Sequence, residues 1–292
     1  MLQVEELTRR YGDTTALDSV SFEVRPGRMT GFVGANGAGK TTAMRIIVGV
    51  LAATSGTVTW GGEELSTERR RRFGYMPEER GLYPKMKLRD QLVFFGRLHG
   101  MSGSQAHARA TELLERLGLE ERLDDVLETL SLGNQQRVQV ATALMHHPAA
   151  LLIDEPFSGL DQLAVDTMVE LLQSELTPEL PVLFSSHQLE LVERLCDDLV
   201  ILSGGRVVAA GPVDALREQE APRYRVVVAE GGTEQLRAAG LRLLSTDGSE
   251  AVVEADGLPP DELLDAVRRV APVSEFARVV RPLSQIYRDV IA

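Results

Sequence analysis

A glycine-rich segment at residues 34–42, Gly-Ala-Asn-Gly-Ala-Gly-Lys-Thr-Thr, constrains this chain more than any other feature. It matches the pattern G-x-x-x-x-G-K-[ST] and lies between a predicted buried strand at 29–33 and a predicted helix that begins near Lys40. Glycines let the backbone curl so that successive N–H groups point at phosphate oxygens, and the helix N-terminus adds its positive dipole. The segment predicts a phosphate-binding loop, in which Lys40 would reach the β- and γ-phosphates and the Thr41 hydroxyl would ligate Mg²⁺.

Composition places the chain among globular proteins and argues against several other classes. With 292 residues, of which 43% are apolar, the chain is long enough for about two domains. Its net charge of −12 argues against a nucleic-acid partner. No segment approaches the ~18–20 uninterrupted apolar residues of a membrane span, and the N-terminus lacks the basic start and apolar core of a signal peptide. The single cysteine, Cys196, excludes an internal disulfide, fits a reducing compartment and is expected to pack rather than to react.

Polar side chains follow two further predicted buried strands. Asp154 and Glu155 come directly after the apolar segment 149–153, and His187 follows the predicted strand at 181–186. Open α/β sheets bind ligands at the carboxyl ends of their strands. We expect Asp154 to hold Mg²⁺, Glu155 to orient and deprotonate the attacking water, and His187 to contact the γ-phosphate. The alternatives are a strand that merely exits into an acidic turn and a histidine with a structural role.

Two single residues carry weaker signals. Tyr11 lies in a predicted loop between strands, where its ring would either stack on a nucleotide base or simply pack. Ser131 is a predicted N-cap, so the helix after it begins either at a second anion site or at an ordinary capped terminus. On these residues alone both alternatives stay open.

The order of predicted elements indicates an α/β domain at 1–215 and a small α+β domain at 222–292, joined by a polar linker at 211–222. The first domain combines the phosphate-binding core with an antiparallel β region and a helical insert at about 87–146. Apolar residues at helical spacing are expected to form the core of the insert, namely Leu88, Leu92, Phe95, Leu98, Ala110, Leu113, Leu114 and Leu117. The second domain follows the order β-α-β-β-α-β, which predicts a ferredoxin-like fold.

The motifs of the first domain occur in one fixed order, and together they resemble the ATP-binding cassette of an ABC transporter over about 215 residues. Tyr11 is similar to the adenine-stacking aromatic residue, residues 34–42 to Walker A, and residues 151–155 to Walker B. Residues 130–137 resemble the signature loop, residues 158–161 the D-loop, and His187 the switch histidine, while Glu78 falls at the Q-loop position. Residues 75–84 and the C-terminal domain resemble a subgroup of bacterial exporter ATPases that includes sodium-extrusion and drug-resistance cassettes.

The resemblance implies a P-loop NTPase (RecA-like) core that hydrolyses ATP with Mg²⁺ as cofactor. Lys40, Glu155 and His187 would be catalytic, and Thr41, Asp154 and Glu78 would ligate the metal. The implied nucleotide contacts are Tyr11, Gly34, Asn36, Gly37, Ala38, Gly39, Lys40, Thr41, Thr42, Ser131, Gly133 and Asp161.

Two motifs depart from the family pattern. Glu78 stands where the family has glutamine; a carboxylate can still ligate Mg²⁺, but it adds a negative charge near the triphosphate. The signature sequence L-S-G-G-Q is Leu-Ser-Leu-Gly-Asn at 130–134, so Leu132 replaces the first glycine and Asn134 is shorter than glutamine by one C–C bond, about 1.5 Å. Ser131 and Gly133 therefore remain the candidates for a γ-phosphate contact.

The resemblance also implies two partners and a location. One partner is a second cassette, with a homodimer preferred to a heterodimer, so that each ATP lies between Walker A of one subunit and Ser131 of the other. The other is a separate transmembrane permease, which residues 78–87, through Leu82, Tyr83 and Met86, and the helical insert would grip. The chain would then lie peripherally on the cytoplasmic face of the membrane. The transported substrate is not indicated by the sequence.

Three alternative functions have less support in the sequence. A soluble ABC-type ATPase that acts on ribosomes or nucleic acid usually has two cassettes or a long coiled coil, and neither occurs in these 292 residues. A regulatory ATP-binder without enzymatic activity is supported only by the altered signature loop, and basal ATPase activity would discriminate against it. A GTPase is disfavoured because no Asn-Lys-x-Asp motif follows the phosphate loop.

Overall fold

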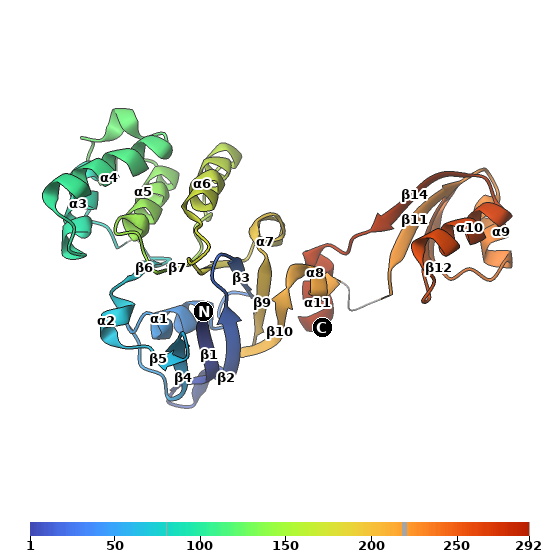
Figure 1. The fold of residues 1–292 in the computed structure, drawn as a ribbon, viewed down its shortest axis with the longest axis horizontal. Helices are drawn as coiled ribbons and strands as arrows, with labels where there is room; N and C mark the ends of the chain where they lie inside the picture. The colour runs from blue at the N-terminus through green and yellow to red at the C-terminus, as the bar shows by residue number, and fades with distance from the viewer. Residues whose placement is uncertain (80, 218–220, 292) are drawn as a thin grey trace. The chain divides into compact units, whose positions relative to one another are not determined.

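The computed structural model describes residues 1–79, 81–217 and 221–291 (Figure 1). The described residues divide into two compact units, residues 1–213 with Ile291 and residues 214–290, and each unit is described by itself. The predicted division into 1–215 and 222–292 stays a prediction.

An antiparallel sheet in the order β2-β1-β4-β5 contains the N-terminus. Its strands are β1 (Leu2–Tyr11), β2 (Thr14–Val24), β4 (Ser55–Trp60) and β5 (Glu63–Glu64). Leu2 and Val4 are buried, as the period-two alternation predicts, and Leu7 is buried because the strand register is irregular between Val4 and Leu7. The prediction that Tyr11 lies in a loop is wrong, because Tyr11 is the last residue of β1 and pairs with Thr14 across a tight turn.

The central sheet has the order β10-β9-β3-β8-β7-β6 and confirms the predicted P-loop NTPase fold. All strands are parallel except the edge strand β10, and their bounds are β3 Met29–Val33, β6 Phe73–Met76, β7 Ala150–Ile153, β8 Val182–Ser186, β9 Asp198–Ser203 and β10 Arg206–Pro212. Every residue of β3, β7 and β8 is buried, as expected for a parallel sheet covered on both faces. Because these strands are parallel and adjacent, their carboxyl ends lie at one edge of the sheet.

Helices surround the central sheet and form the predicted helical insert. Their bounds are α1 Lys40–Ile47, α2 Thr67–Arg70, α3 Leu88–Leu98, α4 Gly103–Arg116, α5 Leu132–Leu144, α6 Gln162–Glu175 and α7 Leu189–Leu195, with short 3₁₀ turns at 120–122 and 127–129. Figure 1 shows α3, α4 and α5 gathered together on the far side of the first unit from β1, β2 and β4.

The predicted core of the insert is right except at Phe95, which is only half-buried, and at Leu98. Leu88 and Leu92 of α3 are fully buried, and so are the four predicted positions at 110–117. Leu98, however, is 65% exposed, whereas Val93, which was not predicted, is buried. Leu98 is the last residue of α3, so no further turn of the helix follows to cover its side chain.

The second unit has the predicted element order β-α-β-β-α-β. Its elements are β11 (Arg223–Val228), α9 (Gly232–Ala238), β12 (Leu243–Asp247), β13 (Glu250–Glu254), α10 (Pro260–Val270) and β14 (Val273–Val279), and all neighbours in the sheet order β12-β13-β11-β14 are antiparallel. Its core joins Tyr224, Val226 and Val253 of the sheet to Leu236 of α9 and Leu263 of α10. A final helix, α11, spans Leu283–Ile291.

The predicted linker at 211–222 is only partly irregular. Its first residues end β10, and α8 (Val213–Arg217) follows at once, with Val213 and Leu216 buried. These two apolar side chains explain why a mostly polar segment folds as a helix here. Residues 218–220 of the predicted linker lie outside the described residues.

Candidate active site

The loop between β3 and α1 takes a shape that only glycine allows at two of its positions. Gly39 has φ +109°, and a Cβ there would lie 2.7 Å from the carbonyl oxygen of Ala16. A Cβ on Gly34 would lie 2.4 Å from the carbonyl oxygen of Leu202. The loop is thus pressed against β2 and β9, while its backbone curls as a phosphate-binding loop requires.

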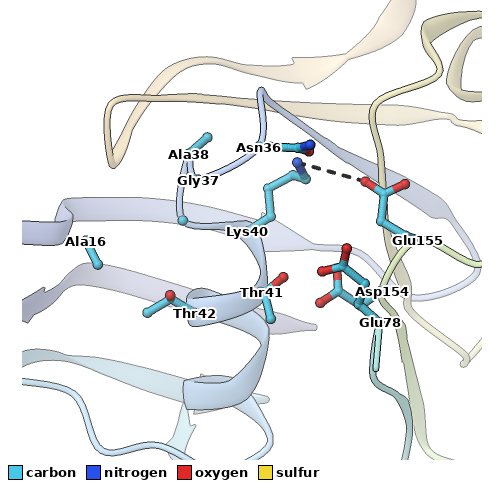
Figure 2. A pocket seen from close by; sticks show the side chains of 11 residues that line it. Ala16, Asn36, Gly37, Ala38, Lys40, Thr41, Thr42, Glu78, Asp154 and Glu155 are labelled. Atoms are coloured by element: carbon cyan, nitrogen blue, oxygen red, sulfur yellow. Dashed lines mark ion pairs between the residues drawn. The ribbon is translucent and has the colours of Figure 1, made fainter. Parts of the chain in front are cut away.

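This loop borders a cleft at the carboxyl edge of the central sheet (Figure 2). The described residues that line it are Ala16, Asn36, Gly37, Ala38, Gly39, Lys40, Thr41, Thr42, Glu78, Asp154 and Glu155. All of these except Ala16 belong to predicted motifs, so segments far apart in the sequence converge on one cavity. Tyr11, Gly34, Ser131, Gly133, Asp161 and His187 were also predicted as site residues, but they do not line this cleft.

Lys40 is the first residue of α1 and spans the loop. Its ammonium nitrogen Nζ donates a hydrogen bond to the carbonyl oxygen of Gly34 at 2.6 Å and lies 4.0 Å from Oε1 of Glu155. The side chain is only 8% exposed. A buried ammonium at this position supplies a concentrated positive charge for a phosphate group in the cleft.

Asp154 follows β7 directly and is completely buried. Its Oδ1 accepts a hydrogen bond from the hydroxyl of Ser185 on β8 at 2.5 Å, whereas its Oδ2 has no partner among the described residues. Burial raises the pKa of Tyr75 nearby, and the Asp154 charge raises it further. A buried carboxylate oxygen without a partner is costly, and a hard oxygen ligand suits Mg²⁺. In Figure 2 the Thr41 hydroxyl points toward the carboxylates of Asp154 and Glu78, so these residues fit a magnesium ion.

Glu155 has a left-handed backbone, with φ +53°, which is uncommon for a residue other than glycine. Two hydrogen bonds hold this conformation: the Glu155 N–H donates to the Ser185 hydroxyl at 2.9 Å, and the Gln136 side chain donates to the Glu155 carbonyl at 3.0 Å. Strain of this kind costs of order 1–3 kcal/mol and persists where the surroundings enforce it. The turn aims the carboxylate of Glu155 at the cleft, close to Lys40.

His187 follows β8 and lies against Glu155. Its Nδ1 is 2.9 Å from Oε2 of Glu155, and the imidazole is 53% exposed. The sequence-based expectation was a contact with the γ-phosphate. The observed contact is with the carboxylate, so His187 reaches the cleft through Glu155.

The signature and D-loop residues occupy the N-termini of two helices outside the cleft. The prediction that Ser131 caps a helix is confirmed, because the N–H of Asn134 donates to its hydroxyl at 3.4 Å. Asp161 caps α6 in the same way, accepting from the Ala164 N–H at 2.8 Å. The two loops adjoin, since a Cβ on Gly133 would lie 3.2 Å from the side chain of Leu160.

Tyr11 is exposed at the end of β1. Its ring is 46% exposed and lies under the guanidinium of Arg9, whose carbon is 4.4 Å from the ring centroid. The Tyr11 ring therefore packs on Arg9, and its stacking on a nucleotide base stays a prediction.

Three residues with a role at the site were missed from the sequence. Ser185 bridges Asp154 and Glu155, Gln136 fixes the Glu155 carbonyl, and Gln139 donates to the Pro77 carbonyl at 2.7 Å, beside Glu78. The two glutamines are buried and three positions apart on α5. Polar residues at helical spacing in an otherwise apolar segment, 136–145, are the signal that would have found them.

An apolar groove lies beside the residues after Glu78. Its described lining is Tyr83, Pro84, Lys85, Met86, Phe94 and Glu128. The Tyr83 ring stands edge-on to Phe94 at 5.8 Å, and the Tyr83 N–H donates to the buried side chain of Gln91. Leu82, which was expected to contribute, is half-buried and does not line the groove. Of the helices that the structure describes, none is long and apolar enough to cross a bilayer.

Comparison with known proteins agrees with this geometry. The family model described as ABC transporter matches residues 17–158. The chain is 42% identical over 217 residues to the ABC transporter ATP-binding protein YhaQ of Bacillus subtilis (strain 168), which covers 74% of this chain and 73% of the relative. It is 36% identical over 214 residues to the linearmycin resistance ATP-binding protein LnrL of the same organism, covering 72% of this chain and 69% of LnrL.

A solved structure shares the fold of the cassette. It is an ATP-binding subunit of an ABC transporter, 35% identical in sequence, and it superposes with a TM-score of 0.69 over 75% of this chain and 92% of its own.

Proposed function

The chain belongs to the ABC transporter family as an ATP-binding subunit with ATPase activity, and from this premise we propose that it drives an exporter by hydrolysing ATP beside a separate membrane permease. The observation that carries the proposal is the convergence of Lys40, Asp154 and Glu155 on one cleft beside the glycine-rich loop. The resistance function in the name of LnrL supports an exporter rather than an importer. The working location of such a subunit is the cytoplasmic face of the membrane.

In the proposed reaction the loop and Lys40 bind the triphosphate. Thr41, Asp154 and Glu78 would hold Mg²⁺, which would supply positive charge to the β- and γ-phosphates. The fit of this ion is supported by the unpartnered Oδ2 of Asp154.

Glu155 orients the attacking water and accepts its proton, because its carboxylate faces the cleft and lies 4.0 Å from the Lys40 ammonium. His187 and Ser185 act as positioning residues. The imidazole holds one carboxylate oxygen of Glu155, while Ser185 fixes the backbone of Glu155 and the carboxylate of Asp154.

A second copy of the chain completes the site. Ser131, Gly133 and Asp161 do not line the cleft of their own chain, but they lie at exposed helix N-termini, where N–H groups suit a phosphate. We assign them to the nucleotide of the partner cassette. Charge-assisted hydrogen bonds contribute about 1.5–3 kcal/mol each, so a few of them on a γ-phosphate would hold the pair closed until hydrolysis removes that phosphate.

The permease docks at the apolar groove in this proposal. Tyr83 and Phe94 are exposed aromatic side chains, and Met86 and Glu128 also line the groove. Aromatic residues beside a pocket are typical anchors of a protein interface. The groove also adjoins the loop that carries Glu78, which gives the nucleotide site a physical connection to the partner.

The substitution Glu155→Gln tests the catalytic assignment. It keeps the shape of the side chain but removes the proton acceptor, so we expect normal ATP binding, turnover lowered by at least about 100-fold and a stable ATP-bound dimer. Phosphate release and size-exclusion chromatography measure these outcomes. Glu170→Gln, on the exposed face of α6, is the matched control and should behave like the wild type. Wild-type turnover in Glu155→Gln would remove Glu155 from the role of base.

A further inference from the structure

The cleft contains more negative than positive charge. Three carboxylates line it, those of Glu78, Asp154 and Glu155, whereas Lys40 is the only positively charged residue among its described lining. Lys40 lies close to Glu155, which also contacts His187. The charges of Asp154 and Glu78 are therefore not balanced by a salt bridge within the described cleft.

Both of these carboxylates have oxygens available to a ligand. Asp154 is completely buried, and its Oδ2 has no hydrogen-bond partner. Glu78 is exposed at the mouth of the cleft and makes no hydrogen bond or ion pair with any residue that the structure describes. Its neighbour Glu79 differs, because its carboxylate lies 3.6 Å from the guanidinium of Arg45 and does not line the cleft.

We propose that Glu78 allows the cleft to bind a divalent cation before the nucleotide arrives, with Asp154 as the second carboxylate ligand and Thr41 as a neutral one. The inference rests on the proposed function and deepens it by assigning an order of binding. With a glutamine at position 78, Asp154 would be the only carboxylate available to the ion, whereas Glu78 provides a second one. A cation already held there would offset the repulsion between these carboxylates and an entering triphosphate, which the loop N–H groups and Lys40 attract.

Two carboxylates are enough for such an ion. Mg²⁺ and Mn²⁺ prefer oxygen ligands, and Mg²⁺ in particular keeps several waters and is commonly bound by only one or two carboxylates. No group of three or more His, Cys, Asp or Glu side chains among the described residues is arranged to hold a metal. We therefore expect a single weak site with mostly water ligands, rather than a protein cage.

The test is a titration of the nucleotide-free full-length chain with Mn²⁺ alone, in which electron paramagnetic resonance measures the free ion. We expect one saturable site in the wild type. Glu78→Gln should weaken it at least about tenfold, because it removes one unit charge beside a doubly charged ion. Glu79→Gln removes the same charge one residue away and should bind Mn²⁺ like the wild type. Circular dichroism and thermal unfolding verify that the variants are folded.

Two results would overturn the inference: no saturable Mn²⁺ site in the nucleotide-free wild type, or equal affinities in the wild type and Glu78→Gln. A fluorescent ATP analogue, added with Mg²⁺ to the same preparations, separates this failure from a failure of the proposed function. If the wild type binds the analogue but not Mn²⁺ alone, the order of binding is wrong and the ATP site stands. If it binds neither, both are wrong.

Discussion

Replacing Ser185 by alanine should destabilise the cassette far more than the loss of one surface hydroxyl. The Ser185 hydroxyl is buried and makes two hydrogen bonds, one donated to the carboxylate of Asp154 at 2.5 Å and one accepted from the Glu155 N–H at 2.9 Å. A hydrogen bond to a charged group contributes about 1.5–3 kcal/mol and a neutral one about 0.5–1.5 kcal/mol. We therefore expect Ser185→Ala to lower the free energy of unfolding by about 2–4 kcal/mol.

The matched control is Ser186→Ala on the same strand. Ser186 is equally buried, but its hydroxyl accepts one neutral hydrogen bond, from the Gln188 N–H at 3.0 Å, so its loss should cost only about 0.5–1.5 kcal/mol. The single tryptophan, Trp60, lies in the cassette and packs on Phe73 with ring centroids 5.1 Å apart. Its fluorescence during urea unfolding thus reports on the cassette.

An equal loss of unfolding free energy in Ser185→Ala and Ser186→Ala would refute the bridging role of Ser185. The same variant also reports on function. Because Ser185 fixes the turn that aims Glu155, we expect slower ATP turnover in Ser185→Ala at unchanged ATP affinity, measured by phosphate release and by nucleotide titration.

Three other perturbations follow from the structure. Gly39→Ala should abolish nucleotide binding, because its Cβ would meet backbone at 2.7 Å, whereas Gly37→Ala, with φ +81° but open space around the Cβ, should cost only about 1–2 kcal/mol in urea unfolding. Burial, with neighbouring imidazoles, lowers the pKa of His146 to about 4, so the unfolded chain binds a proton that the folded chain does not between pH 6.5 and about 4. The free energy of unfolding should therefore fall by about 1.4 kcal/mol per pH unit as the pH drops through this range, and His146→Leu should remove that slope in urea titrations. The double variant Tyr83→Ala/Met86→Ala should lose co-purification with the permease while keeping basal ATPase activity.

Each of these outcomes has a clear contradiction. Nucleotide binding by Gly39→Ala as tight as in the wild type would show that the loop does not press on β2. A pH slope shared by the wild type and His146→Leu would assign the dependence to other groups. Unchanged co-purification and coupling in the double variant would exclude the groove as the docking site; Val50→Ala, 72% exposed elsewhere on the cassette, is its control.

The elements that carry the site were predictable from the sequence because their signals are local. The glycine spacing at 34–39, the apolar strand before Asp154 and the N-cap at Ser131 each depend on a few neighbouring residues. The alternation of strands and helices in 222–292 likewise predicted the ferredoxin-like topology, and α10 and α11 begin and end where the pattern predicts.

What the sequence did not predict depends on contacts between distant segments. Ser185 meets Asp154 only because β8 lies beside β7, and Gln136 meets the Glu155 carbonyl only because α5 packs at the end of that strand. A serine has no pattern of its own that indicates such a partner, and the helical spacing of Gln136 and Gln139 marks a polar position without identifying the group that it meets. The exposure of Leu98 is a different case, because helical periodicity identifies a face but not the point at which packing stops.

The left-handed backbone of Glu155 has a consequence for laboratory evolution of this chain. Glycine and asparagine adopt φ near +53° with less strain than glutamate, but neither has a carboxylate that reaches both Lys40 and His187. A saturation library at this codon, sorted for thermal resistance, would therefore enrich glycine or asparagine, whereas a sort for transport would enrich glutamate. Selection for stability and selection for transport would therefore favour different residues at position 155.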